Sequence, residues 1–226
     1  MANVSHDFRS PLTSINGYLK AMEDGTIPPE MYPKYIGIVL NETERLIKLT
    51  NNLLTLNNLN TEGMILDKTD FDINEVIRKT ISTFEGSCRE KKIAMELSLT
   101  GETLPVHADL TRIQQVLYNL IDNAIKYSSS PNHESLIEIN ASQLDDDHLS
   151  ITVKDNGCGI SAADLPKIKT KFFKANHTKR GSGIGLAVAD EIITMHHGSL
   201  NITSEEHVGT TVQIILPTAE SGSIEL

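Results

Sequence analysis

One histidine near the start of the chain stands in a segment suited to nucleophilic chemistry. His6 and Ser10 are four residues apart, so a helix places both on one face, and Asp7 directly follows the histidine. A neutral imidazole is a competent nucleophile near neutral pH, and a carboxylate beside it can orient the ring or take its proton. Pro11 would bend that helix by removing a hydrogen bond to the carbonyl of Asp7. The segment predicts a reactive histidine, against the alternative of an ordinary surface histidine.

A second set of polar side chains interrupts an apolar helical pattern over residues 110–128. Asn119, Asn123 and Lys126 follow the spacing i, i+4 and i+7, which puts two amides and one ammonium on a single stripe. Amide oxygens suit Mg²⁺, and an ammonium suits phosphate oxygens. The alternative is an ordinary solvated face, although such a face favours Glu and Lys over paired Asn.

Two glycine-rich segments complete the candidate chemistry. Residues 155–160 follow a predicted strand, where glycines let the backbone approach a ligand and Asp155 could accept a hydrogen bond from an exocyclic amine. Residues 181–186 open a predicted helix, where free N–H groups and the helix dipole favour an anion. This second segment does not follow a strand directly, which argues against a dinucleotide-binding Rossmann unit. Neither segment alone specifies a ligand.

The stretch between the two glycine segments is basic in an otherwise acidic chain. Residues 167–180 contain no acidic side chain, whereas the whole chain has a formal net charge of −10. The basic residues of this stretch are Lys167, Lys169, Lys171, Lys174, Lys179 and Arg180. A polyanion such as a triphosphate is the simplest reason for this local excess, and a solvated loop is the alternative.

The reactive histidine must be positioned by the helical first part of the chain. Apolar residues recur at helical spacing over residues 8–22, and those over residues 39–56 follow a heptad pattern. A break at residues 24–29, which contain a glycine and two prolines, makes the two helices a hairpin in which Phe8 and Leu12 are expected to face the core. One hairpin cannot bury both sides of its seam, so we expect a dimer forming a four-helix bundle. Packing on the second half of the same chain is the alternative.

Strands and helices alternate from residue 63 onward. Strands are expected at residues 64–73, 93–100, 104–109, 136–144, 149–154, 199–205 and 210–216, and helices at residues 74–92, 110–128 and 184–196. Asp109 is placed to cap the helix over residues 110–128, with Leu110 among its inward residues. Because several strands are neighbours in sequence, the pattern predicts a mixed sheet with helices on one face, an α+β sandwich. We therefore expect two domains, residues 1–61 and residues 62–226.

Composition excludes several other classes of protein. The chain has 226 residues with Lys+Arg 20 and Asp+Glu 30, and this acidic balance disfavours a general nucleic-acid binder. No apolar run reaches the ~18–20 residues of a membrane span, and the first residues lack the pattern of a signal peptide. Cys88 and Cys158 are too isolated for a disulfide framework or a metal site, which fits a reducing compartment.

Taken together, these segments resemble the sequence boxes of bacterial two-component sensor histidine kinases, in that family's order and over essentially the whole chain. The matching segments are residues 5–12 for the H box, 119–128 for the N box, 155–160 and 181–186 for two glycine boxes, 172–174 for the F box and 209–211 for a last glycine box. Any one box is modest support, whereas six in order make a specific pattern.

The resemblance implies a fold and a set of roles. The first domain would be the dimerisation and histidine-phosphotransfer hairpin. The second would be the α/β-sandwich ATP-binding domain shared by histidine kinases, type II topoisomerases and heat-shock chaperones. His6 would be the phosphorylated residue, Asp7 its base or orienting group, and Ser10 the residue that governs phosphatase activity. Asn119 and Asn123 would hold Mg²⁺ and phosphate.

The family pattern also implies the remaining nucleotide contacts. Asp155 would accept from the adenine amine with support from Thr210, and Lys126 would contact phosphate. The other contacts implied are Tyr127, Gly157, Gly159, Ile160, Phe172, Lys179, Arg180, Gly181, Gly183, Ile184, Gly185 and Leu186.

Three positions depart from the usual boxes. Asp7 stands where Glu is common, and Ser10 stands where Thr or Asn is common in members that also dephosphorylate their partner. Lys169 stands near the place of the first phenylalanine of the F box. The first two departures bear on phosphatase activity more than on kinase activity.

These features predict an ATP- and Mg²⁺-dependent protein histidine kinase that passes its phosphoryl group to the receiver domain of a response regulator, with weak phosphatase activity. We expect a homodimer that binds no nucleic acid and lies in the cytoplasm, joined to the bacterial plasma membrane only through upstream segments. A clamp-like ATPase of the same fold would leave residues 6–11 unexplained. A catalytically silent interaction module would predict damaged nucleotide motifs, whereas Asn123 and Asp155 are intact.

Overall fold

The computed structural model describes residues 2–59, 66–128, 134–175 and 183–218, except for the side chains of residues 2–4, 6 and 56–59. The chain folds into two compact units, Met1–Asn60 and Thr61–Leu226. This division falls one residue before the domain boundary expected from the sequence. Each unit is described by itself.

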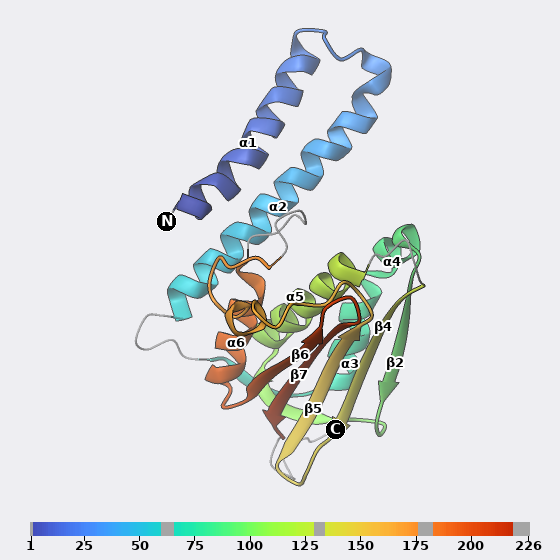
Figure 1. The fold of residues 1–226 in the computed structure, drawn as a ribbon, viewed down its shortest axis with the longest axis vertical. Coiled ribbons are helices and arrows are strands. Elements are labelled where there is room, and N and C mark those ends of the chain that lie inside the picture. The colour runs from blue at the N-terminus through green and yellow to red at the C-terminus, as the bar shows by residue number, and fades with distance from the viewer. Residues whose placement is uncertain (1, 60–65, 129–133, 176–182, 219–226) are drawn as a thin grey trace. The chain divides into compact units, whose positions relative to one another are not determined.

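The first unit is a hairpin of two long helices (Figure 1). Its elements are α1 (Ala2–Glu23), the 3-10 turn η1 (Pro29–Met31) and α2 (Tyr32–Leu59). The predicted break is closed by two contacts: the Ile27 N–H donates to the Ala21 carbonyl at 2.8 Å, and the Tyr32 hydroxyl donates to the Met22 carbonyl at 2.8 Å. These bonds satisfy carbonyl groups at the end of α1 that have no partner within the helix.

Part of the apolar surface of α1 does not face α2. Leu12, expected in the core, is 53% exposed, and Phe8 is half-buried. The contact between the helices includes Tyr18 and Tyr35, whose ring centroids are 5.3 Å apart. Two helices bury only one stripe each against one another, so the remaining apolar residues lie on the surface of the hairpin. Those exposed in this unit are Leu12, Leu19, Met31, Ile36, Leu40, Ile47 and Leu54.

The second unit contains a five-stranded mixed sheet with helices on one face, as predicted (Figure 1). The strand order is β2-β4-β5-β7-β6, with β2 and β4 parallel and all other neighbours antiparallel. The strands of this unit are β1 (Lys68–Asp72), β2 (Ile93–Leu99), β3 (Pro105–Asp109), β4 (Ser135–Gln143), β5 (His148–Asp155), β6 (Ser199–Glu205) and β7 (Gly209–Pro217). β1 and β3 form a separate antiparallel pair, which the sequence did not predict.

The helices of this unit pack on the sheet and supply about half of the buried apolar residues. They are α3 (Ile73–Ser82), α4 (Glu85–Lys91), α5 (Leu110–Ser128), α6 (Gly185–Met195) and the 3-10 turn η2 (Leu165–Lys167). α5 has the predicted bounds, and the Arg112 N–H donates to Asp109 Oδ1 at 3.1 Å, as expected of an N-cap. Its buried stripe is Ile113, Val116, Leu117, Leu120, Ile121, Ala124 and Ile125. Leu110 was expected inward but is 38% exposed, because it is the first residue of the helix and precedes its first buried turn.

The single helix expected over residues 74–92 is wrong, because the chain forms α3 and α4 instead. Phe84 leaves the helical path and buries its ring against Tyr118, with 4.7 Å between ring centroids. The Thr83 hydroxyl donates to the Thr80 carbonyl at 2.7 Å and satisfies the end of α3. Burial of one aromatic ring therefore outweighs continuation of the helix.

The strand expected over residues 64–73 is shorter than predicted: β1 covers Lys68–Asp72, so the described residues 66, 67 and 73 lie outside it. β1 stops at Asp72, whose Oδ1 accepts from the Asn74 N–H at 3.0 Å and so caps α3. Residues 64 and 65 of this prediction lie outside the described residues. Among the described helices of both units, none combines the length and the apolar character needed to cross a membrane.

Candidate active site

The segment around the predicted reactive histidine lies in the first half of α1. The backbone of His6 is helical, and its side chain lies outside the described part of the structure. Asp7 and Pro11 are buried, whereas Ser10 is exposed. The structure therefore places Ser10 at the surface, one helical turn from His6, as its predicted role requires.

Asp155 is the last residue of β5 and carries a buried carboxylate, only 8% exposed. Its Oδ1 accepts from the Gly157 N–H at 2.9 Å, and its neighbour across the β5–β7 ladder is Thr210. Burial raises the pKa of Asp155 to about 6, although backbone hydrogen bonds from Gly157 and Thr210 act in the opposite direction. A buried acceptor of this kind suits an amine of a planar ligand.

The glycines that follow Asp155 are required by close backbone approaches. A Cβ on Gly157 would lie 2.3 Å from the Tyr127 carbonyl oxygen, and one on Gly159 would lie 1.9 Å from the Glu205 carbonyl oxygen. Gly159 also has φ +62, which side chains disfavour. The loop after β5 is thereby fitted against the end of α5 and the β6–β7 hairpin.

Ser204 is a site residue that the sequence patterns did not reveal. Its hydroxyl accepts from the Ile160 N–H at 2.9 Å, donates to the Gly209 carbonyl at 2.8 Å and lies 2.8 Å from the Thr210 hydroxyl. One side chain thus joins the loop after β5 to the hairpin that carries Thr210. The available signal was the predicted hairpin itself, whose register pairs Ser204 with Thr210.

The predicted stripe on α5 is half-buried, and one of its members, Asn119, contacts the start of α6. Asn119 Nδ2 donates to the Gly185 carbonyl at 3.2 Å, which brings two of the predicted boxes together. Lys126 Nζ donates to the Tyr127 hydroxyl at 2.9 Å. Burial raises the pKa of Tyr127, and the nearby groups of Cys158 and Asp122 act in the same direction, so this hydroxyl is neutral.

The start of α6 is joined to the F-box segment. The Phe172 N–H donates to the Gly183 carbonyl at 2.9 Å, and a Cβ on Gly183 would lie 2.5 Å from the Phe173 carbonyl oxygen. Gly183 has φ +67, and Ile184 is fully buried. Gly185 and Leu186, in the first turn of α6, are half-buried. The predicted contacts Lys179, Arg180 and Gly181 lie outside the described residues.

One member of the basic stretch has a different role from the one predicted. Lys169 Nζ donates to Asp190 Oδ1 at 2.7 Å and also to the Leu200 carbonyl. Its charge is thus paired within the fold rather than presented to a polyanion. The prediction counted charges along residues 167–180 and could not include a carboxylate 21 residues away.

The side chains on α5 fit a hydrated magnesium ion that also binds phosphate. Because Asn119 uses its amide nitrogen toward Gly185, its oxygen remains an acceptor at the start of α6. Asn123 lies one turn farther along the same half-buried stripe. Two amide oxygens suit Mg²⁺, which usually takes few protein ligands and completes its shell with water and phosphate.

Comparison with known proteins adds to this geometry. A family model described as "Histidine kinase-, DNA gyrase B-, and HSP90-like ATPase" matches residues 108–220, and one described as "His Kinase A (phospho-acceptor) domain" matches residues 1–62. The chain belongs to the sensor histidine kinases. This kinase is 35% identical over 223 residues to the sensor protein kinase WalK of Staphylococcus saprophyticus, a match that covers 96% of this chain and 36% of WalK. The chain therefore spans about a third of the length of such curated relatives.

Solved structures of other histidine kinases are similar to this kinase. The histidine kinase AdeS of Acinetobacter baumannii has a TM-score of 0.74 at 29% identity, covering 95% of this chain and 98% of the AdeS chain. The catalytic domain of ThkA has a TM-score of 0.61 at 30% identity, covering 68% of this chain and 97% of that domain. ThkA in complex with the response regulator protein TrrA has a TM-score of 0.74 at 29% identity, covering 96% of this chain and 60% of the ThkA chain.

Proposed function

We propose that this histidine kinase uses ATP to phosphorylate its own His6 and then passes the phosphoryl group to an aspartate on a response-regulator receiver domain. Residues 1–61 would be the dimerisation and phosphotransfer domain, and residues 62–226 the ATP-binding domain. The observation that supports this proposal most is the buried carboxylate of Asp155, held by backbone N–H groups beside the close-fitting Gly157. An acceptor kept dry in this way suits the amine of adenine.

The proposed reaction has two balanced steps. First, a ring nitrogen of His6 bonds to the γ-phosphorus of ATP while the bond from that phosphorus to the β-phosphate oxygen breaks, and ADP leaves. Asp7 orients the imidazole or takes its proton. Second, a carboxylate oxygen of the regulator bonds to the phosphorus and the phosphorus–nitrogen bond breaks, which restores His6. Such transfers depend mostly on positioning and on stabilisation of charge.

The residues of the second unit divide this positioning between them. Asn119 and Asn123 would hold Mg²⁺, which neutralises phosphate charge when bound. Lys126 and the N-terminal end of α6 would face the phosphates, since an ammonium and the N–H groups of a helix start both favour anions. Ser10, exposed on α1, would tune a weak phosphatase activity toward the phosphorylated regulator.

Phosphorylation is tested with γ-labelled ATP and Mg²⁺. We expect acid-labile, alkali-stable label on the wild-type chain and none on His6→Gln, with nucleotide affinity unchanged. His148→Gln is the matched control, because His148 lies at the β4–β5 hairpin, bound to Asp145 at 2.9 Å, and should label normally. Label that persists on His6→Gln would contradict the assignment of His6.

The proposed homodimer would use the exposed apolar face of the hairpin. Leu40, Ile47 and Leu54 are 57%, 55% and 54% exposed and recur every seventh residue of α2, as in a helical bundle seam. Ile47→Glu should weaken dimerisation at least about tenfold, because a buried unpaired charge is costly. Asn41→Glu, exposed on another side of α2, should not. Sedimentation over a concentration series measures both, and equal dimer constants would place the interface elsewhere.

The cellular setting is also a proposal. We infer that these residues act in the bacterial cytoplasm as the catalytic core of a longer sensor kinase, whose other segments reach the plasma membrane. The support is that curated relatives named sensor protein kinases are covered to 36% of their length by this chain. Fractionation of cells that express the full gene product tests it.

A further inference from the structure

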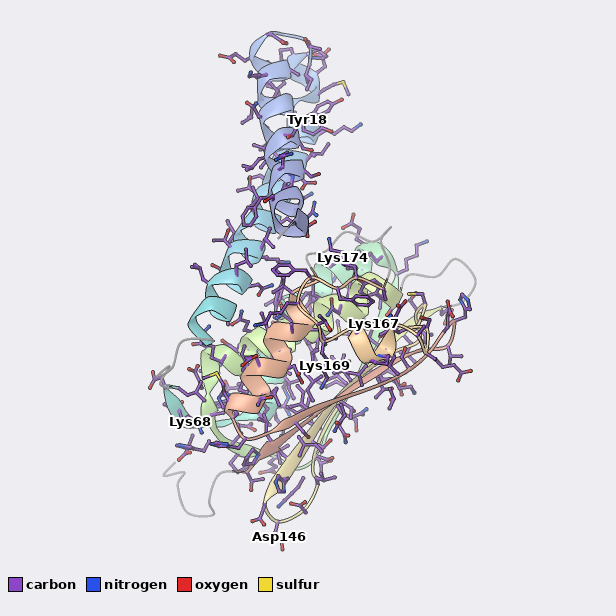
Figure 2. All side chains as sticks on the ribbon, turned by 60° about the vertical axis from the view of Figure 1, so that its left-hand side comes forward. Tyr18, Lys68, Asp146, Lys167, Lys169 and Lys174 are labelled. Carbon is purple, nitrogen blue, oxygen red and sulfur yellow. The ribbon has the colours of Figure 1, made fainter. Side chains whose placement is uncertain are left out.

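The side chain of Lys169 joins three segments of the second unit, and the nucleotide chemistry above gives it no role. Its ammonium donates to Asp190 Oδ1 at 2.7 Å on α6 and to the Leu200 carbonyl on β6, 21 and 31 residues away in sequence. Lys169 itself is labelled in Figure 2. An ionised donor makes stronger hydrogen bonds than a neutral one. Lys169 therefore fastens the segment just after η2 to both a helix and a strand.

The strand that Lys169 reaches is at the open edge of the five-stranded sheet. Among the strands that the structure describes, β6 pairs only with β7, where Leu200 faces Ile214. An edge strand presents backbone groups that no neighbouring strand satisfies. Lys169 supplies a donor to one such carbonyl, and its side chain is 37% exposed, so the contact is partly shielded from solvent.

A second contact attaches the same segment to the start of α6. Three residues after Lys169, the Phe172 N–H donates to the Gly183 carbonyl at 2.9 Å. Phe172 has φ +68, a left-handed conformation that a bulky residue rarely adopts. Such a conformation persists only where surrounding contacts hold it, and it is common beside ligand sites.

These contacts meet at one end of the proposed nucleotide site. Gly183 and Gly185 lead into α6, and Asn119 donates to the Gly185 carbonyl at 3.2 Å. Asp190 lies farther along this helix, so Lys169 contacts α6 itself, whereas Phe172 contacts Gly183, two residues before α6 begins. Both contacts join residues 165–174 to the region of the N-terminal end of α6.

We propose that Lys169 is a positioning residue for the triphosphate: its bonds to α6 and β6 hold residues 165–174, and Phe172 in its left-handed conformation, beside the start of α6. An ionic contact here stands where the F-box pattern has a phenylalanine. The inference rests on the proposed use of ATP, and it assigns Lys169 to the fold rather than to direct contact with phosphate.

The test compares two ligands and several variants of the whole chain. A non-hydrolysable ATP analogue with Mg²⁺ reports the triphosphate end, and adenosine reports the Asp155 end alone. We expect Lys169→Met to weaken binding of the analogue about tenfold, the scale of one lost charge-assisted hydrogen bond. The affinity for adenosine should stay within about twofold of wild type. In labelling assays the same variant should raise the KM for ATP more than it lowers kcat.

Conservative variants and a matched control separate positioning from general stability. Lys169→Arg keeps a cationic donor and should restore analogue affinity to within about twofold of wild type. Asp190→Asn should weaken only the analogue, as Lys169→Met does. Lys79→Met removes an ion pair of the same 2.7 Å separation, with Glu75 on α3, and should leave both affinities unchanged.

The outcomes are distinguishable. The proposal is supported if Lys169→Met loses affinity for the analogue but keeps its affinity for adenosine, and if Lys169→Arg restores the affinity for the analogue. Unchanged analogue affinity in Lys169→Met, or equal loss of both ligands, would overturn it. Unchanged analogue affinity in Asp190→Asn would instead assign the lysine to direct phosphate contact and would also overturn the proposal, because only the positioning role needs the Lys169–Asp190 pair. If the wild-type chain binds neither ligand and takes no label, the proposed function fails, and that result is independent of the Lys169 variants.

Discussion

The two ends of the proposed nucleotide site are built in different ways. Residues 155–160 are held by backbone and hydroxyl hydrogen bonds, including those of Gly157 and Ile160, and by close backbone contacts. The contacts of residues 165–174 include the bonds of the Lys169 ammonium to α6 and β6 and a backbone hydrogen bond from Phe172 to Gly183. In the proposed site the first region would exclude water around a neutral, planar part of the ligand, and the second would lie beside the helix start that favours its charged part.

This difference separates two kinds of recognition within the proposed site: recognition of the shape of the base at one end and of phosphate charge at the other. Buried hydrogen bonds, such as that from the Gly157 N–H to the Asp155 carboxylate, change little with ionic strength, whereas a partly exposed ion pair is screened by salt. Changes near Asp155 should therefore alter recognition of the base, and changes near Lys169 should alter binding of phosphate. The following predictions test that division from its largest expected effect to its smallest.

The largest effect is expected at Gly157, where shape alone decides. In Gly157→Ala the new Cβ would lie 2.3 Å from the Tyr127 carbonyl oxygen and 2.8 Å from Asp155 Oδ1, so the loop must shift. Adenosine and ATP affinity should both fall by about 100-fold or more, with a stability loss of about 1–3 kcal/mol from overpacking. Gly86→Ala is the control, since nothing lies within 4 Å of that Cβ. Calorimetric titration measures the affinities of both variants for adenosine and ATP. Near-normal adenosine binding in Gly157→Ala would contradict the claim that shape governs this end of the site.

The next effect is the pH dependence of Asp155. Because burial raises its pKa to about 6, the carboxylate needed for adenine is mostly protonated at pH 5. Adenosine affinity should fall about tenfold between pH 7.5 and pH 5 in the wild type, following the ionised fraction. In Asp155→Asn it should be weak and nearly independent of pH. Adenosine is used because it carries no titrating phosphate, and a flat wild-type profile would contradict the prediction.

The contribution of Asp155 to folding stability should change with pH in the opposite direction to its contribution to adenosine affinity. A carboxyl whose folded pKa is raised favours folding below its unfolded pKa, and that contribution is lost as the pH rises through about 6. Asp155→Asn should therefore stabilise the ligand-free chain at pH 7.5 by about 1–3 kcal/mol, with a smaller gain near pH 4. Denaturant titrations at the two pH values measure this. A loss of stability at pH 7.5 would show that the carboxylate is not desolvated.

The smallest effect is expected at Ser204. Ser204→Ala removes the hydroxyl that joins Ile160, Gly209 and Thr210, so adenosine affinity should fall about three- to tenfold, the scale of one or two lost hydrogen bonds. The loss should be the same at low and high salt, in contrast to that of Lys169→Met. Ser98→Ala, exposed on β2, is the control. A strongly salt-dependent loss of adenosine affinity in Ser204→Ala would contradict the proposed division between the Asp155 end and the Lys169 end.

Several features follow from the sequence because their causes are local. The bounds of α5 follow from an apolar stripe and the Asp109 cap, and the hairpins β4–β5 and β6–β7 follow from alternation and turns. The mixed sheet with helices on one face was predicted from the order of strands and helices, and membership of the histidine kinase family from the order of the boxes. The roles of the individual site residues remain predictions.

Tertiary structure decided the features that depend on partners distant in sequence. The break between α3 and α4 follows from burial of Phe84 against Tyr118, and the surface position of Leu12 follows from the limited cover that one helix gives another. Ser204 and Lys169 gain their importance from residues on other elements, which no local pattern reveals. Periodicity and capping are encoded within a few residues of chain, whereas the pairing of a hydroxyl or an ammonium depends on which distant backbone and carboxylate the packed sheet and helices bring beside it.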